Sequence, residues 1–368
     1  MSEKQAIAVH VPSWLYQFDT GITIFVRGLY KSIRESGEYR LLKIGPSQCE
    51  FNSLDEAKEF VKKNNIALVI YHDNRIAPAR KAREKGLNYL EQCVPFLNPK
   101  ESDIANDKIE TKRILRMLNI PVLPDASIRT RAELYAQMEE GKLYVGKLHD
   151  SGSGRGVKLI KRIENNFFEY HDRVWKKINV RDTEKGIKLS NVWGISVFFL
   201  IGLCIFALLF FATNIRSITA LLLLGLSTIE VALYLPDKLG QSFVYNPLML
   251  EPYFGDGTDE FFCLRCTVIG DKVVEAAKKA NKKNVTPNIS HGGKATSIVL
   301  SQEQKDMAIA ATKAVGATYS GVDLLYAEGR TVVCEVNVGP IGVYCEQTGV
   351  DVGKLLAEYA IQQCKKMS

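Results

Sequence analysis

Three oxygen-bearing side chains in the last fifty residues of the sequence have the spacing of a cation site. Glu335 and Asn337 lie two residues apart in the apolar run TVVCEVNV, and Asp323 lies in the preceding run GVDLLY. Residues i and i+2 of a strand face the same side, so Glu335 and Asn337 converge, and Asp323 on a neighbouring strand can join them. Such oxygen ligands suit Mg²⁺ held together with nucleotide phosphates. The alternative is a solvated hairpin with scattered acidic residues, which the apolar surroundings disfavour because burying an unpaired acid is costly.

A glycine-rich loop earlier in the chain has the composition of a phosphate-binding loop. The segment LYVGKLHDSGSGRGVKLIKR reads as strand, loop and strand, and the backbone N–H groups and hydroxyls of such a loop can bind phosphate. Its candidate residues are Lys147, Ser151, Gly152, Ser153, Gly154 and Gly156. A dinucleotide fingerprint needs a helix after the loop, whereas VKLIK predicts a strand, so a Rossmann site is disfavoured. An ordinary glycine-serine hairpin loop is the alternative.

The composition is that of a globular chain with more than one domain. Its 368 residues are 46% hydrophobic and 24% charged, with a formal net charge of +7. These values exclude disorder and a small disulfide scaffold. Basic and acidic residues are mixed along the chain, so we expect no nucleic-acid partner. The eight cysteines predict reduced thiols in a cytoplasmic setting, and Cys263 and Cys266 would face opposite sides of a strand, which disfavours zinc.

Short apolar runs alternate with amphipathic stretches, which predicts an α/β chain. Residues 6–11 and 66–72 read as buried strands, and residues 21–36 and 53–64 read as helices. A helix beginning near Asn106 leads into an Ile-Pro turn, and a later helix covers residues 302–317. These elements must position the polar residues described above.

Two long apolar runs in the middle of the chain, the first without a charged residue and the second with only Glu230 near its end, predict a transmembrane hairpin. Residues 189–215 and 217–236 are each long enough to cross a bilayer as a helix, and a pair of buried core helices is the alternative. Basic residues before the first run predict that both termini and the catalytic part are cytoplasmic, with the chain multi-pass in the cytoplasmic membrane. Residues 165–188 read as a basic amphipathic helix, lying either on the membrane surface or on protein.

The order of these motifs resembles the ATP-grasp superfamily and, within it, the RimK-type carboxylate–amine ligases. The resemblance covers residues 95–362, with 165–245 left out. It implies an α/β ATP-grasp fold with an α+β lid, a preceding N-terminal α/β domain and a two-helix transmembrane hairpin inserted in the lid. The expected divisions are residues 1–100 for the N-terminal domain, 101–164 and 245–258 for the entry helix, lid and adenine-side linker, 165–188 for the juxtamembrane segment, 189–236 for the hairpin and 259–368 for the C-terminal catalytic domain.

The same resemblance implies roles for individual residues. Lys108, Glu251 and Tyr253 would contact the nucleotide together with Lys147 and its glycine loop. Asp323, Glu335 and Asn337 would hold magnesium. The implied catalytic residues are Arg265, Asn288 and His291. The segment TPNISHGG departs from the family pattern, because Thr286 and His291 stand where arginines are common, and Lys279 replaces another arginine. His291 then serves as an acid, a base or a hydrogen-bond donor, or is a structural loop residue.

The activity implied by the resemblance is amide formation. ATP would phosphorylate a carboxylate, and an amine would attack the acyl phosphate, with Mg²⁺ (or Mn²⁺) as the metal. With the predicted hairpin, the expected protein is a membrane-anchored ligase with the lipid bilayer as partner, a membrane-borne substrate and a homo-oligomeric assembly. A kinase of the same fold and a nucleotide-binding membrane sensor or scaffold without turnover are the alternatives. The departures from the family's arginines put glutamate as the amine substrate in question.

Overall fold

The chain folds into two compact units. The computed structural model describes residues 4–10, 21–71, 86–149, 156–171, 173–191, 242–255, 257, 259–289, 292–339 and 341–367. Unit 1 comprises Met1–Leu123, Phe254–Lys282 and Thr286–Ser368. Unit 2 comprises Pro124–Tyr253 and Lys283–Val285.

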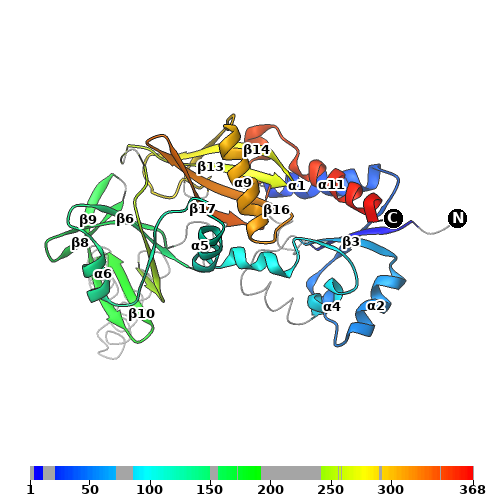
Figure 1. Ribbon diagram of the computed structural model, residues 1–368, viewed down its shortest axis with the longest axis horizontal. Helices are drawn as coiled ribbons and strands as arrows, with labels where there is room; N and C mark the ends of the chain where they lie inside the picture. Colours follow the sequence, from blue (N-terminus) through cyan, green and yellow to red (C-terminus); the bar gives the residue numbers. More distant parts are fainter. Residues whose placement is uncertain are drawn as a thin grey trace, which may run out of the picture. The chain divides into compact units, whose positions relative to one another are not determined.

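The first sheet of unit 1 is parallel and has helices on both faces. Its order is β2-β1-β3-β4, with bounds Arg40–Ile44, Ala6–His10, Ile66–Tyr71 and Phe96–Leu97. The covering helices are α1 (Gly21–Glu35), α11 (Val352–Met367), α2 (Leu54–Lys63) and α4 (Asn88–Glu91). Ile7 and Val9 pack toward α1 and α11, which lie side by side (Figure 1), whereas Ala8 packs toward α2 and α4. Because both of their faces are buried, the central strands β1 and β3 are almost entirely apolar, and the strands predicted at residues 6–11 and 66–72 are confirmed.

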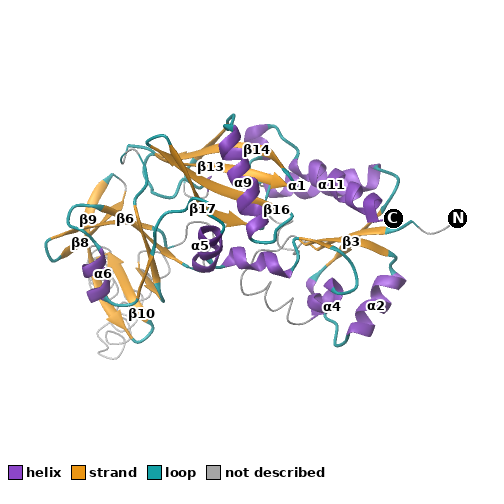
Figure 2. Cartoon of the chain, viewed as in Figure 1, coloured by secondary structure: helices purple, strands orange, loops and turns teal. Residues whose placement is uncertain are grey.

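The second sheet of unit 1 is antiparallel and carries Arg265 and the three predicted cation ligands, Asp323, Glu335 and Asn337. Its order is β15-β14-β13-β16-β17, with bounds Lys294–Ser297, Lys272–Asn281, Phe261–Ile269, Tyr319–Ala327 and Arg330–Asn337. Helix α9 (Gln302–Ala314) lies across it (Figure 2), and α5 (Lys108–Met117) packs into the same core. The short helical segments of unit 1 are η2 (Pro46–Cys49), η4 (Lys100–Asn106) and α10 (Cys345–Thr348).

Unit 2 is built on one antiparallel sheet of eight strands. The order is β11-β10-β9-β8-β7-β6-β12-β5. The bounds in that order are Ser242–Tyr245, Gly186–Asn191, Val174–Thr183, Asn166–His171, Lys158–Ile163, Leu143–Leu148, Leu248–Pro252 and Ala126–Ile128. Helix α6 (Arg131–Gln137) packs on one face, where alternate residues of the strands form the core. The predicted strands on either side of the glycine-rich loop are confirmed as β6 and β7, which pair with each other.

The predicted amphipathic helix at residues 165–188 is wrong, because this segment forms β8, β9 and β10. Ile178 and Val180 are buried while Asn179 and Arg181 are exposed, which is the period of a strand. The chain reverses at Gly186, whose φ is +130° and where a Cβ would lie 2.2 Å from the Tyr245 carbonyl oxygen. Only glycine fits this turn, so the helix cannot continue through it.

The predicted membrane placement is also corrected. Within the part of the chain that the structure describes, no helix is long and apolar enough to cross a membrane. The first residues of the predicted hairpin, Leu189–Asn191, pair with β9 as the end of β10. The rest of that hairpin, residues 192–236, lies outside the described residues. The expected two-span localisation in the cytoplasmic membrane is therefore contradicted by the helices and strands that the structure describes.

Candidate active site

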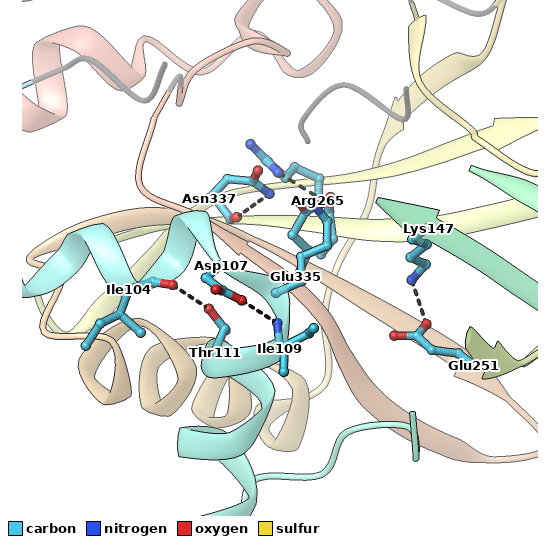
Figure 3. A network of polar contacts seen from close by, with 12 residues as sticks. Ile104, Asp107, Ile109, Thr111, Lys147, Glu251, Arg265, Glu335 and Asn337 are labelled. Atoms are coloured by element: carbon cyan, nitrogen blue, oxygen red, sulfur yellow. Dashed lines mark hydrogen bonds and ion pairs between the residues drawn. The ribbon is translucent and has the colours of Figure 1, made fainter. Parts of the chain in front are cut away.

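The two carboxylates predicted to share a site lie directly opposite each other in unit 1. In the antiparallel pair of β16 and β17, Asp323 is opposite Glu335 and Gly321 is opposite Asn337. An irregularity in the pairing follows Asp323. The Asn337 amide donates to the Gly321 carbonyl at 3.4 Å, so this side chain is held at the same end of the strands (Figure 3). The structure thus brings together the three residues predicted to bind a cation.

Asp323 is buried beside two cations, one from the adjacent strand β13 and one from β14, which lies beyond β13. Arg265 of β13 lies opposite Asp323, and its Nη1 is 3.3 Å from Oδ1. Lys279 of β14 places Nζ 3.0 Å from the same carboxylate. Burial by itself would raise the pKa of Asp323, but the charges of Lys279 and Arg265 hold that pKa below its ordinary value. Asp323 is therefore a buried carboxylate whose charge is balanced by two cations.

Arg265 lies against the backbone of β16 because residue 321 has no side chain. A Cβ at Gly321 would be 2.3 Å from the Arg265 Cζ atom. The guanidinium therefore fills the space that any other residue at position 321 would occupy. This close approach fixes the direction in which Arg265 reaches Asp323.

Lys108 reaches the same cluster from the first turn of α5. Its Nζ is 3.2 Å from the Glu335 Oε1 atom, and both side chains are largely buried. The helix begins here because Asp107 caps it, its Oδ1 accepting from the N–H groups of Ile109 at 2.9 Å and Glu110 at 3.1 Å (Figure 3). The cap thus places the lysine next to Glu335.

Lys279 and Asn288 also meet in unit 1. The Lys279 Nζ is 3.4 Å from the Asn288 Oδ1 atom, and the lysine is only 3% exposed. Burial lowers the pKa of Lys279, but Asp323 and its other neighbours Cys263 and Tyr344 together outweigh that effect, so the pKa is raised. The predicted catalytic residue His291 lies outside the described residues.

No motif in the sequence selects Tyr344, which is 6% exposed and whose pKa burial raises. The sequence pattern marks Lys279 only as the replacement of an arginine. The strand pairing that brings it to Asp323 joins residues more than forty positions apart, so no local pattern signals it.

Unit 2 contains the other residues that were predicted to contact the nucleotide. Lys147 of β6 and Glu251 of β12 form a buried ion pair with 2.6 Å between Nζ and Oε2 (Figure 3). The backbone N–H of Tyr253 donates to the Leu143 carbonyl at 2.9 Å, which continues the pairing of β12 with β6. Gly156 closes the glycine-rich loop with a φ of +71°. Ser151, Gly152, Ser153 and Gly154 lie outside the described residues.

Comparison with known proteins relates part of this chain to one domain family. Residues 248–360 match the model of a RimK-like ATP-grasp domain. A probable alpha-L-glutamate ligase of Haemophilus influenzae (strain PittEE) is 39% identical over 98 residues, which are 26% of this chain and 33% of that protein. The corresponding protein of Pasteurella multocida (strain Pm70) is 41% identical over 91 residues, 24% of this chain and 29% of that protein. The match thus spans about a third of the length of these relatives.

Solved structures extend the likeness to the whole chain. The ATP-grasp ligase PsnB complexed with a minimal precursor gives a TM-score of 0.54 at 15% identity, covering 98% of this chain and all of that one. The D-alanine–D-alanine ligase of Bacillus anthracis gives 0.51 at 16% identity, covering 99% of this chain and all of that one. The chain therefore has the ATP-grasp fold, and the resemblance inferred from its motifs is confirmed at that level.

Proposed function

We propose that this protein is an ATP-dependent carboxylate–amine ligase that forms an amide through an acyl phosphate. The observation that carries the proposal is the meeting of Asp323, Glu335 and Asn337 with three cations from separate elements, Arg265, Lys108 and Lys279. A cluster of oxygen ligands ringed by cations suits phosphoryl transfer, in which negative charge must be held in place. The ligases among its relatives support the same reaction.

The donor set fits magnesium. Two carboxylates and an amide oxygen are hard ligands, and a site that also uses phosphate oxygens needs few ligands from the protein. Asp323, Glu335 and Asn337 would hold the ion, and when bound it would neutralise charge on the phosphates. Asp323 is ionised without a metal, so no proton has to leave it before binding.

The other residues of the candidate site would bind the phosphoryl group, the nucleotide and the carboxylate substrate. Arg265 would stabilise the charge that develops on the phosphoryl group, because its direction is fixed by Gly321. Lys108 would contact the nucleotide phosphates from the start of α5. In unit 2, Lys147 would bind phosphate, and Glu251 and Tyr253 would lie on the adenine side. Asn288 would orient the carboxylate substrate beside Lys279.

We infer that the amine substrate carries less negative charge than glutamate. The charge of Lys279 is already balanced by Asp323, and Thr286 is uncharged where relatives of this type commonly have arginine. Among the described residues, neither of these two positions therefore supplies an unbalanced cation for a second carboxylate. The acceptor carboxylate would belong to an amino acid or a peptide.

Trapping with hydroxylamine tests the reaction. The full-length chain is incubated with ATP, Mg²⁺ and a panel of amino acids and short peptides, and hydroxamate and ADP are measured together. We expect hydroxamate with at least one carboxylate and, when an amine replaces hydroxylamine, a product mass that corresponds to an amide. Glu335→Gln should lower turnover at least about a hundredfold, because it removes a charge that holds the metal.

The matched control is Glu328→Gln, on the same β16–β17 hairpin, whose carboxylate is exposed and pairs with Arg330. It should leave turnover unchanged. A stable phosphoester as the only product would identify a kinase instead. Nucleotide binding without ADP formation for every carboxylate would overturn the ligase.

A further inference from the structure

One side of the unit 2 sheet packs against α6. Ile178 and Val180 of β9 lie in the core on that side, and so do Ile187 and Leu189 of β10. Successive residues of a strand point to opposite sides of a sheet, so the residues that alternate with these four lie on the other side. We call this other side of the adjacent strands β7, β8, β9 and β10 the basic face, because it bears Lys161, Lys177, Arg181 and Lys188.

Within the described strands β7 to β10, every charged residue of the basic face is a cation. The register places Lys161 and Lys177 on either side of Phe168. Arg181 lies directly opposite Lys188. Lys177 and Arg181 are exposed, and Lys161 and Lys188 are half-buried. This side of the sheet therefore presents positive charge to the solvent.

The two carboxylates of these four strands, Glu169 and Asp182, lie on the α6 side and are engaged there. The Glu169 Oε2 atom is 2.6 Å from the Nζ atom of Lys158. The Asp182 Oδ1 atom accepts from the backbone N–H of Arg131, the first residue of α6, at 2.6 Å. Neither carboxylate therefore balances the charge of the basic face.

The cations of the basic face repel one another in the folded chain. Like charges directly opposite each other in an antiparallel pair are destabilising, and Arg181 and Lys188 form such a pair. Lys161 places its Nζ atom 4.0 Å from the centroid of the Trp175 ring, and this cation–π contact holds the lysine at the surface of the sheet. The repulsion is unfavourable for folding, and an anion bound on this face would offset it.

We propose that the basic face binds an acidic segment of a partner protein. Arginine and lysine bind carboxylates through charge-assisted hydrogen bonds, and clusters of such cations recognise acidic peptides. The Trp175 ring is contacted by Lys161 and meets the Tyr170 ring edge-on, with 5.2 Å between the ring centroids. Because its neighbours engage this ring, a peptide rich in carboxylates fits the surface better than a nucleic acid, whose bases need aromatic rings on which to stack. The basic face lies apart from the residues proposed to carry out the reaction, and its role does not depend on the ligase function.

Peptide binding in the absence of ATP tests the proposal. The first probe is a fluorescein-labelled peptide of 10 residues, the length of β9, in which glutamate alternates with serine. The second probe is the same peptide with glutamine in place of each glutamate. Each is titrated into the full chain, and binding is followed by fluorescence anisotropy. We expect the acidic peptide to bind at least about tenfold more tightly than the glutamine peptide, with an affinity that falls as NaCl is added, because salt screens exposed charges.

Charge reversal identifies the surface that binds the peptide. The double variant Lys177→Glu, Arg181→Glu should weaken binding of the acidic peptide at least about tenfold and leave ADP affinity unchanged. Its melting temperature should not fall, because the substitution at position 181 replaces a repulsive pair with Lys188 by an attractive one. The matched control is Lys62→Glu, Lys63→Glu, which changes the net charge by the same amount at exposed positions of α2 in unit 1. This control should bind the acidic peptide as the wild-type chain does.

Three results would contradict the proposal. Equal affinity for the two peptides, or unchanged affinity of the Lys177→Glu, Arg181→Glu variant, would overturn the basic face as a binding surface and leave the ligase unaffected. An equal loss of affinity in the Lys62→Glu, Lys63→Glu control would attribute binding to net charge and would overturn it as well. A single-stranded oligonucleotide that binds the wild-type chain more tightly than the acidic peptide does would overturn the choice of partner.

Discussion

Position 321 has no room for a Cβ atom, so it requires glycine. A methyl group there would lie 2.3 Å from the Arg265 Cζ, so Gly321→Ala must push the guanidinium away from Asp323. We expect a loss of about 1 to 3 kcal/mol in the free energy of unfolding, measured with urea, because overpacking strains a filled site. The rate of ADP formation should fall by more than the loss of folded protein explains, because the displaced group is Arg265.

The control is Gly45→Ala, because a Cβ at Gly45 would meet only the Gln48 Oε1 atom, at 3.8 Å. It should change neither unfolding nor turnover appreciably. Full turnover by Gly321→Ala would show that Arg265 is not required where the structure places it.

At the scale of residues, local spacing predicted part of the site. Glu335 and Asn337 are neighbours on one strand face, and the Asp323 pairing follows from a short hairpin, so both could be read from the sequence. Lys279 could not, because it reaches Asp323 through strand pairing between residues that are distant in the sequence.

At the scale of elements, the cap of α5 determines where Lys108 stands. Asp107→Ala removes the oxygen that accepts two N–H groups of the first turn and should lower the free energy of unfolding by about 1 kcal/mol. Because Lys108 is the first residue of this helix, the KM for ATP should rise as well. Ser301→Ala removes the cap of α9 and is the matched control. It should lower stability to a similar extent and leave the KM unchanged; an equal rise in KM for both variants would contradict the role of the cap.

Elements with local signals were predicted well, and the segment after the glycine-rich loop was not. Helices such as α1 and α9 have an amphipathic period, and β1 and β3 are short apolar runs between turns, so each could be read by itself. In residues 165–188, lysines and arginines alternate with Trp175, Ile178 and Val180, which fits a helix and a strand almost equally. Pairing with β7 and β11 decides for strands, and that pairing is long-range.

At the scale of the whole molecule, residues 192–241 join two strands that are already paired. Ser190 of β10 lies opposite Ser242 of β11, so the two strands stay paired close to the points where this connection begins and ends. Replacing residues 192–240 by Asn-Gly would place a two-residue turn between Asn191 and Gln241 in the same register. We expect this shortened chain to fold with a melting temperature within about 4 °C of the full chain, since a shorter connection costs less entropy to close.

The same variant separates the fold from the predicted membrane hairpin. If β10 and β11 need only each other and β9, the shortened chain should bind ADP with unchanged affinity and form hydroxamate at the rate of the full chain. The control is the shortened chain with the additional substitution Val180→Asp, which places a charge in the core face of β9. Its free energy of unfolding should fall by several kcal/mol, because the buried charge has no partner. Loss of ADP binding in the shortened chain, with its melting temperature preserved, would mean that residues 192–240 contribute to the nucleotide site itself.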